Sequence, residues 1–214
     1  MIVYGSSMSP YVRKVLAFAA EKGIEVETQP IGLNSDDPEF LEASPFRKIP
    51  AFRDGDFAIS DSSAIVAYLD ALKPEPALIP SEPKARARAI WYDEFADTIM
   101  GACGTKMFFN RIVAPRFLNR EGDMVAADKA EGEELPPILD YLERTIPASG
   151  FLVEDRLTLA DIAVASPFAN FRHLGLSCFE GRPKLAAYVE AILSRPSFSP
   201  WIAREAAFLE RSAA

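Results

Sequence analysis

A short hydroxyl-rich segment near the start of the chain has the residue types that can hold an anion. Residues 5–14 read Gly-Ser-Ser-Met-Ser-Pro-Tyr-Val-Arg-Lys. Pro10 suits the first position of a helix, which makes Ser9 the expected N-cap residue. The free N–H groups and the positive dipole end of a helix start stabilise an anion, and the hydroxyls of Ser6, Ser7 and Ser9 stand beside them. The segment therefore predicts either a plain helix cap or an anion site.

Two later segments open a regular element with a proline or with polar groups. Residues 47–52 read Arg-Lys-Ile-Pro-Ala-Phe, and Pro50 is expected at the first residue or the edge of a strand, because an interior strand needs the N–H that proline lacks. Residues 59–65 read Ile-Ser-Asp-Ser-Ser-Ala-Ile, which are polar residues opening an apolar helix. As a plain helix start this is ordinary. As a site, the Asp61 carboxylate, the hydroxyls and the free N–H groups suit a ligand carrying both an ammonium and a carboxylate.

The elements that must position these segments alternate between strand and helix patterns over residues 1–72. Runs rich in β-branched or aromatic residues predict strands at Ile2–Tyr4, Glu25–Ile31, Ala51–Phe52 and Phe57–Ile59. Apolar residues three and four apart predict two helices, one through Val12, Val15, Leu16 and Ala19 and one through Ile65, Tyr68, Leu69 and Leu72. Asp54-Gly55 marks a tight hairpin. The expected order is β-α-β, then a loop or short helix, then β-β-α.

The second part of the chain has a different sequence pattern. Pro74, Pro76, Pro80 and Pro83 fall too close together for the interior of a helix or strand, so they predict a stiff linker. Beyond it the apolar spacing is helical and a strand pattern is almost absent. Residues 84–214 therefore predict an all-α domain of four to six helices. Pro136-Pro137 should break or kink one of these helices near its middle.

Composition limits the possible functions. The 214 residues suit one large domain or two small ones, and 23 basic against 31 acidic residues give a net charge of −8, which argues against bulk binding of nucleic acid or anionic membranes. No apolar run is long enough to cross a membrane, and the start does not read as a signal peptide, so we expect a cytoplasmic protein. Cys103 and Cys178 belong to no cluster that suggests a disulfide framework or a zinc site. His173, the single histidine, is interpreted as a helix-end residue near the C-terminal carbonyls.

Together these segments resemble the cytosolic glutathione transferase family, and the resemblance covers essentially the whole chain. Thr158-Leu159-Ala160-Asp161 resembles the family's helix-starting motif in its second domain, and it is a variant capping box that we assign to folding. The resemblance implies a thioredoxin-like α/β domain with a mixed sheet over residues 1–75, which binds glutathione. It also implies an all-helical bundle over residues 84–214, which carries the electrophile pocket.

The resemblance assigns roles to particular residues. Ile49-Pro50 resembles the family's X–cis-Pro, whose first residue pairs by its backbone with the cysteinyl part of glutathione, and this overrides the general cis frequency of about 5–6%. Lys48, beside this pair, joins the glutathione-binding candidates. Asp61 and Ser62 match the acidic-Ser pair that holds the γ-glutamyl end.

Three serines are candidates for the residue that faces the thiol of glutathione. Ser9 falls where serine-type members place this residue, while Ser6 and Ser7 resemble the double serine of zeta-like members and remain open as alternatives. Tyr4 and Tyr11 invite comparison with tyrosine-type classes, but Tyr4 falls within a strand and Tyr11 within a helix, so both rank below the serines.

One departure from related families bears on the reaction. No cysteine occupies the Ser-Pro-Tyr position, where glutaredoxins and omega-like members carry one, so exchange through a protein thiol has no nucleophile there. Cys103, in the helical part, is expected to be buried and inert. This favours a serine-type transferase that activates the thiolate of glutathione, its co-substrate, for attack on hydrophobic electrophiles, with no metal. Two alternatives stay open: a non-catalytic binding or regulatory protein of this fold, and a zeta-type isomerase, which Met8 disfavours because those members carry cysteine there.

The resemblance also implies a homodimer. Asp97 would then reach the ammonium end of a neighbour's glutathione, or else remain a solvated carboxylate on an exposed helix face. A thioredoxin-like part of about 75 residues has a marginal core, so burying further surface should stabilise it. Aromatic residues of the second part are candidates either for an apolar pocket or for ordinary core: Phe108, Phe109, Phe117 and Phe168.

Overall fold

A four-stranded mixed sheet organises the first part of the chain in this computed structural model, which describes residues 1–32 and 35–212. Its strands are β1 (Ile2–Tyr4), β2 (Glu27–Gln29), β3 (Ala51–Asp54) and β4 (Phe57–Ser60). The spatial order is β2-β1-β3-β4, with β1 parallel to β2 and the other pairs antiparallel. The expected mixed sheet is confirmed, although β2 is shorter than predicted while β3 and β4 run further.

Three helices accompany the sheet, namely α1 (Pro10–Glu21), α2 (Pro38–Ala43) and α3 (Ser62–Leu72). The short α2 settles the alternative left open between a loop and a helix, and it begins where Asp37 caps the N–H of Phe40. Residues 54–57 form the predicted hairpin, in which Asp54 pairs with Phe57 and Gly55 takes a φ of +60° that glycine adopts without strain.

The second part is entirely helical in the described residues. It contains five continuous helical runs. The first run comprises α4 (Pro83–Glu94), the π-helical η1 (Phe95–Met100), α5 (Gly101–Phe108), the π-helical η2 (Phe109–Val113) and α6 (Ala114–Phe117), and the second comprises α7 (Met124–Lys129), the π-helical η3 (Ala130–Glu134) and α8 (Leu135–Thr145). The other three runs are the single helices α9 (Leu159–His173), α10 (Pro183–Leu193) and α11 (Ser199–Arg211). The predicted interruption at Pro136-Pro137 is present, because the α-helical pattern gives way to η3 directly before these residues, which have no N–H to donate.

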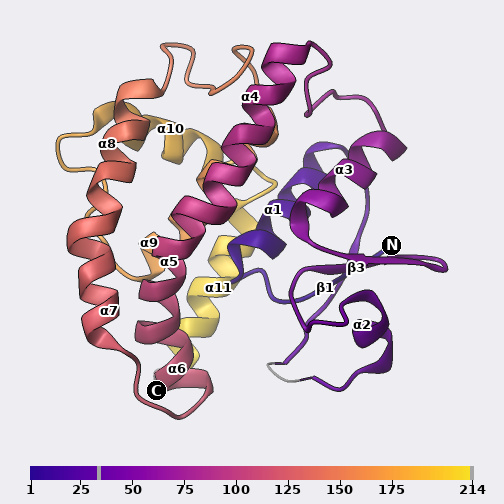
Figure 1. Cartoon of the computed structure of the whole chain (residues 1–214), viewed down its shortest axis with the longest axis horizontal. Coiled ribbons are helices and arrows are strands. Elements are labelled where there is room, and N and C mark those ends of the chain that lie inside the picture. The colour runs from indigo at the N-terminus through magenta and orange to yellow at the C-terminus, as the bar shows by residue number, and fades with distance from the viewer. Residues whose placement is uncertain (33–34, 213–214) are drawn as a thin grey trace.

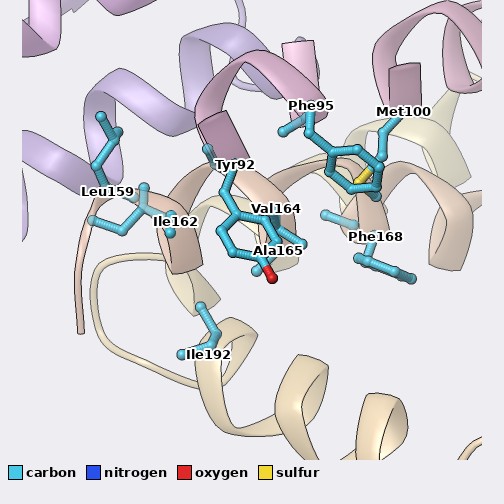
Figure 2. Packing of buried hydrophobic residues seen from close by; sticks show 14 of the residues in the cluster. Tyr92, Phe95, Met100, Leu159, Ile162, Val164, Ala165, Phe168 and Ile192 are labelled. Atoms are coloured by element: carbon cyan, nitrogen blue, oxygen red, sulfur yellow. The ribbon is translucent and has the colours of Figure 1, made fainter. Parts of the chain in front are cut away.

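Helix α9 is the central element of the helical part. Nearly its whole length is buried, and α4, α5, α10 and α1 all pack against it. Figure 2 shows Tyr92, Phe95 and Met100 of the first helical run above Ile162 and Phe168 of α9. The predicted capping box is confirmed, since the Asp161 carboxylate accepts the N–H groups of Thr158 and Leu152.

The two parts of the chain meet along α1. Figure 1 shows the sheet and helices α1–α3 on one side and the helical part on the other, with α1 between them. The apolar stripe of α1 is fully buried, which places its N-terminus, and the serine segment before it, next to α9. The part of the chain that the structure describes has no helix long and apolar enough to span a membrane.

Candidate functional site

The serine segment forms the turn between β1 and α1, and Ser9 is the N-cap of α1 as predicted. Its hydroxyl accepts the N–H of Val12 at 3.5 Å. Gly5, before the serines, has a φ of +132°, and a Cβ there would lie 2.8 Å from Cγ2 of Val12 and 3.1 Å from Cβ of Ile49. Only glycine fits this conformation and this close approach. The turn therefore lies directly against Ile49.

The peptide between Ile49 and Pro50 is cis, as the family resemblance implied. Pro50 is buried and immediately precedes β3, where Ala51 pairs with Tyr4 of β1, whereas the Lys48 side chain is exposed. The carbonyl oxygen of Pro50 accepts the N–H of Asp61 at 3.4 Å. The cis-proline thus joins the serine turn on one side to the start of α3 on the other.

Asp61 is the N-cap of α3 and has a strained backbone. Its carboxylate accepts the N–H groups of Ser63 and Ala64 at 2.9 and 3.0 Å, while the residue itself is exposed. Its φ of 87° and ψ of 125° lie where residues other than glycine are rare. Strain of this kind persists only where the surrounding structure enforces it, and it gathers at functional sites.

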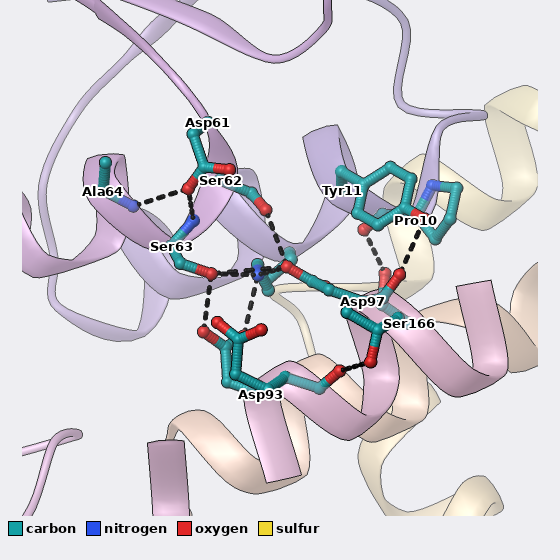
Figure 3. A network of polar contacts seen from close by, with 12 residues as sticks. Pro10, Tyr11, Asp61, Ser62, Ser63, Ala64, Asp93, Asp97 and Ser166 are labelled. Atoms are coloured by element: carbon teal, nitrogen blue, oxygen red, sulfur yellow. Dashed lines mark hydrogen bonds and ion pairs between the residues drawn. The ribbon is translucent and has the colours of Figure 1, made fainter. Parts of the chain in front are cut away.

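Ser62 faces inward, into a buried polar cluster between the two parts of the chain. Its hydroxyl lies 3.2 Å from the Asp97 carboxylate, and Ser63 donates to Asp93 at 2.7 Å, as Figure 3 shows. The ammonium of Lys14 lies between the two carboxylates, 2.7 Å from Asp93 and 2.6 Å from Asp97. The cluster therefore balances one buried cation against two carboxylates and two hydroxyls.

The side chain of Asp97 is largely buried, which is contrary to the solvated role considered for it. The carboxylate is not simply solvated, because its side chain is 20% exposed and pairs with Lys14 and Ser62 of its own chain. Burial is the largest influence on the pKa of Asp97 and leaves it above the usual range, although the charge of Lys14 opposes this shift. Asp97 therefore holds α3 against η1 within the chain, and its contact with a neighbour's glutathione stays a prediction.

The other serines and the two tyrosines have distinct partners. The Ser6 hydroxyl accepts the N–H of Met8 at 3.3 Å. Ser7 makes a hydrogen bond that helps to lower the pKa of Glu205. Tyr4 lies in β1 and Tyr11 in α1, as predicted; their hydroxyls lie 3.2 Å from Oε2 of Glu39 and 3.2 Å from the backbone oxygen of Asp97, and burial raises both phenol pKa values. Of the three serine hydroxyls, only that of Ser9 caps α1.

The structure also gives the surroundings of the histidine and of the two cysteines. His173 ends α9, as predicted, and its Nε2 lies 2.9 Å from the Glu205 carboxylate of α11, a partner that the sequence did not indicate. The prediction of a buried, inert Cys103 is confirmed. Burial raises the pKa of both Cys103 and Cys178 to about 11, so neither is a thiolate at neutral pH.

A cavity of about 400 Å³ opens in the helical part between η1 and α8, lined by Phe95, Ile99, Cys103, Glu134, Pro137, Ile138 and Tyr141. None of the four phenylalanines named as pocket candidates lines it. Phe168 is buried core, packed on Phe171 and Phe179, and Phe117 stacks on Phe208.

Sequence reasoning missed the buried charges of α1. Arg13 and Lys14 are both almost completely buried, Arg13 against Glu205 and Lys14 against Asp93 and Asp97. A signal was present, because the two charges sit inside a run of apolar residues from Val12 to Ala20 that leaves them little exposed surface. Arginine and lysine side chains that are buried among apolar residues require buried polar or acidic partners.

Comparison with known proteins agrees with this geometry. Residues 3–77 match the family model of the glutathione S-transferase N-terminal domain, and residues 109–205 match that of the C-terminal domain. The chain is 30% identical to "Glutathione S-transferase" of Hyoscyamus muticus over 93% of this chain and 96% of that protein. It is 33% identical to human "Glutathione S-transferase theta-2" over 85% of this chain and 77% of that protein.

A solved structure described as "glutathione S-transferase III in apo form" superposes with a TM-score of 0.79 at 30% identity, covering 94% of this chain and 95% of the other. The fold, the convergence of three chain segments and these likenesses all agree: the chain belongs to the glutathione S-transferase family.

Proposed function

We propose that this chain is an enzyme that transfers glutathione to hydrophobic electrophiles. Residues 1–75 bind glutathione, and residues 84–214 supply the electrophile pocket. The observation that carries this proposal is the convergence of the Ser9 turn, the cis Ile49-Pro50 peptide and Asp61, through the contact of Gly5 with Ile49 and the hydrogen bond of Asp61 to Pro50.

Catalysis in this proposal consists of keeping the glutathione thiol ionised. A cysteine-like thiol has a pKa near ~8.5, so only a few per cent is thiolate at neutral pH. A hydrogen bond to a charged group contributes about 1.5–3 kcal/mol, which corresponds to about one to two pKa units, and the α1 dipole adds about 0.3–1 kcal/mol. Because a hydroxyl accepts and donates at once, Ser9 can cap Val12 and still donate its proton to the thiolate sulfur.

Binding of the peptide part uses backbone groups. Neither the N–H nor the C=O of Ile49 makes a hydrogen bond within the described chain, so both are available to a cysteinyl backbone laid beside them. At the start of α3 the exposed Asp61 carboxylate suits the γ-glutamyl ammonium. Since the Ser62 hydroxyl faces Asp97, Ser62 would contribute its N–H to the γ-glutamyl carboxylate.

The same proposal includes a homodimer and a cytoplasmic location. Phe46, in the turn before β3, is 85% exposed, and Trp91 and Ile99 are exposed beside the cavity of the helical part. Exposed aromatic and aliphatic groups around a concave apolar surface are typical of a contact between subunits. Two free buried cysteines suit a reducing compartment.

Retention on immobilised glutathione, followed by conjugation of a chloronitrobenzene, tests the proposal. We expect the full chain to be retained, eluted by free glutathione, and active in forming the thioether with release of chloride. Retention without conjugation of any electrophile in a broad panel would favour the non-catalytic binding protein. Failure of both measurements would contradict the proposal.

A further inference from the structure

Two side chains of α9 hold the backbone of the serine turn from the other part of the chain. Nδ2 of Asn170 donates to the carbonyl oxygen of Met8 at 2.9 Å, and the hydroxyl of Ser166 donates to the carbonyl oxygen of Pro10 at 2.7 Å. Both side chains are almost completely buried. Met8 and Pro10 are the residues on either side of Ser9, so the turn is tethered on both sides of its candidate catalytic residue.

Arg13 orients this pair of tethers. Its guanidinium is completely buried and donates to Oδ1 of Asn170 at 3.0 Å and to the carbonyl oxygen of Ser166 at 2.7 Å. An amide group whose oxygen faces Arg13 must turn its NH2 the other way, toward Met8. The orientation of the Asn170 amide is therefore fixed by a completely buried cation.

Glu205 of α11 holds Arg13 in turn. Its carboxylate receives Nε and Nη2 of Arg13 at 3.2 and 2.7 Å and lies 2.9 Å from Nε2 of His173. Burial acts to raise the pKa of this carboxyl, but the hydrogen bond to His173 and the charge and hydrogen bonds of Arg13 outweigh burial, and the pKa is lowered. Glu205 therefore stays charged and keeps Arg13 paired.

We propose that Asn170 is a positioning residue for the transferase reaction, because its amide fixes the Met8–Ser9 peptide and thereby aims the Ser9 hydroxyl at the glutathione sulfur. The proposal rests on the proposed function of Ser9. The peptide group is planar, so holding the carbonyl of Met8 also fixes the N–H of Ser9. With the carbonyl of Pro10 held by Ser166, rotation of the Ser9 backbone is restricted on both sides, which fixes the direction of its Cα–Cβ bond. The N–H of Val12 then holds the hydroxyl oxygen in one rotamer.

The size of the effect follows from geometry. A displacement of about 1 Å between reacting groups can cost up to about a hundredfold in rate. Asn170 is 4% exposed and its amide is used by Met8 and Arg13, so it is not expected to bind glutathione or the electrophile itself. Losing its tether should therefore change the rate and the thiol pKa more than the affinity. A residue that only stabilised the fold would leave the thiol pKa unchanged.

The test compares Asn170→Ala and Ser166→Ala with Glu21→Gln in the full chain. Glu21, at the other end of α1, binds Arg195 and Ser197 and so also joins the two parts of the chain, but it does not contact the serine turn. The thiolate absorbance of bound glutathione against pH gives the thiol pKa, and steady-state rates give kcat and KM. We expect Asn170→Ala to lower kcat about tenfold and to raise the thiol pKa by about one unit, with less than a twofold change in KM.

Ser166→Ala removes one hydroxyl and should act in the same direction, whereas Glu21→Gln should lower Tm without moving the thiol pKa. A folded Asn170→Ala variant with the thiol pKa and kcat of the unchanged protein would overturn the proposal, and so would equal thiol pKa shifts in Glu21→Gln. If the Asn170→Ala variant does not fold, the thiol pKa and kcat of the Ser166→Ala variant test the proposal in the same way.

A second measurement separates this proposal from the proposed function. Amide hydrogen exchange over residues 5–13, in protein free of glutathione, reports the tether directly. We expect faster exchange there in Asn170→Ala and Ser166→Ala but not in Glu21→Gln, and unchanged exchange would overturn the tether even in an active enzyme. If the unchanged protein neither binds nor ionises glutathione, the proposed function fails, while the exchange result still decides whether Asn170 orders the turn.

Discussion

The ammonium of Lys14 lies 2.6 Å from the carboxylate of Asp97, and both groups sit where the two parts of the chain meet. Lys14 also pairs with Asp93, so it is the cation that separates two neighbouring carboxylates. Lys14→Met should leave both carboxylates without their cation. Breaking a buried pair by removing one partner costs about 3–5 kcal/mol, and we expect a loss of this size in the free energy of unfolding measured in urea.

Lys106→Met is the matched control for this substitution. Lys106 pairs with Glu134 across 2.7 Å, but the two side chains are 45% and 31% exposed. Exposed pairs contribute about 0–1 kcal/mol, so this variant should unfold close to the unchanged protein. Equal losses in both variants would mean that the Lys14 cluster is solvated in solution and does not hold the two parts of the chain together.

The Ser9 hydroxyl is expected to control ionisation of bound glutathione. Ser9→Ala removes a charge-assisted hydrogen bond, so the pKa of the bound thiol should rise by about one unit or more. The rate near neutral pH should fall about tenfold or more, with a smaller change in glutathione affinity. The absorbance of the bound thiolate against pH measures the shift.

Ser6→Ala and Ser7→Ala are the controls for Ser9. Ser6 accepts the N–H of Met8 and Ser7 interacts with Glu205, and neither hydroxyl caps α1, so neither lies at the positive end of this helix in the way Ser9 does. If one of them moves the thiol pKa and Ser9→Ala does not, the assignment of the thiol-facing serine is wrong.

The carboxylate of Asp61 caps α3, and in the proposed function it also binds glutathione; one substitution can separate the two roles. Asparagine caps a helix about as well as aspartate, so Asp61→Asn should keep α3 intact while removing the charge proposed to bind the γ-glutamyl ammonium. We expect a higher KM for glutathione, nearly unchanged thiol pKa and unchanged Tm. Asp61→Ala should add a loss of stability of about 1 kcal/mol through the missing cap. Unchanged glutathione affinity in both variants would remove Asp61 from the site.

Local signals in the sequence were sufficient for most of the elements. The Ser9 cap, the hairpin at Asp54-Gly55 and the capping box at Thr158 all depend on residues a few positions apart, and the structure confirms each of them. Helix α2 also had a local signal, because Asp37-Pro38 is a good cap followed by a good first residue.

The candidate site could be predicted only in part, because its polar partners come from distant parts of the chain. Arg13 meets Glu205 of α11, and Lys14 meets Asp97 of η1. These pairs depend on how α1 packs against the helical part, and no pattern within α1 specifies that packing. The inward direction of the Ser62 hydroxyl follows from the same packing.

Stability in acid should depend on Glu205. Burial acts to raise its pKa, but the hydrogen bonds from His173 and Arg13 and the charge of Arg13 outweigh burial and lower the pKa in the folded protein below the ordinary value of 4.5. The Glu205 carboxyl therefore binds its proton more tightly in the unfolded chain than in the folded protein. The stability that the ionised carboxylate adds is fully present above pH 4.5 and is lost as the pH falls through the lower pKa of Glu205 in the folded protein. Glu205→Gln should be less stable at neutral pH but lose less stability on acidification, measured by urea unfolding across this range. Parallel pH profiles for the two proteins would contradict the pairing.

The proposed homodimer can be tested directly in solution. Light scattering at micromolar concentration should give about twice the chain mass of 23.5 kDa. Ile99 is 50% exposed at the cavity of the helical part, and Ile99→Asp would place a charge in the proposed contact, so this variant should be monomeric but folded. Val125→Asp adds the same charge at a residue that is 81% exposed and does not line the cavity, and it should remain dimeric. A strictly monomeric, fully active protein would contradict the dimer, and a dimeric Ile99→Asp variant would place the contact on another surface.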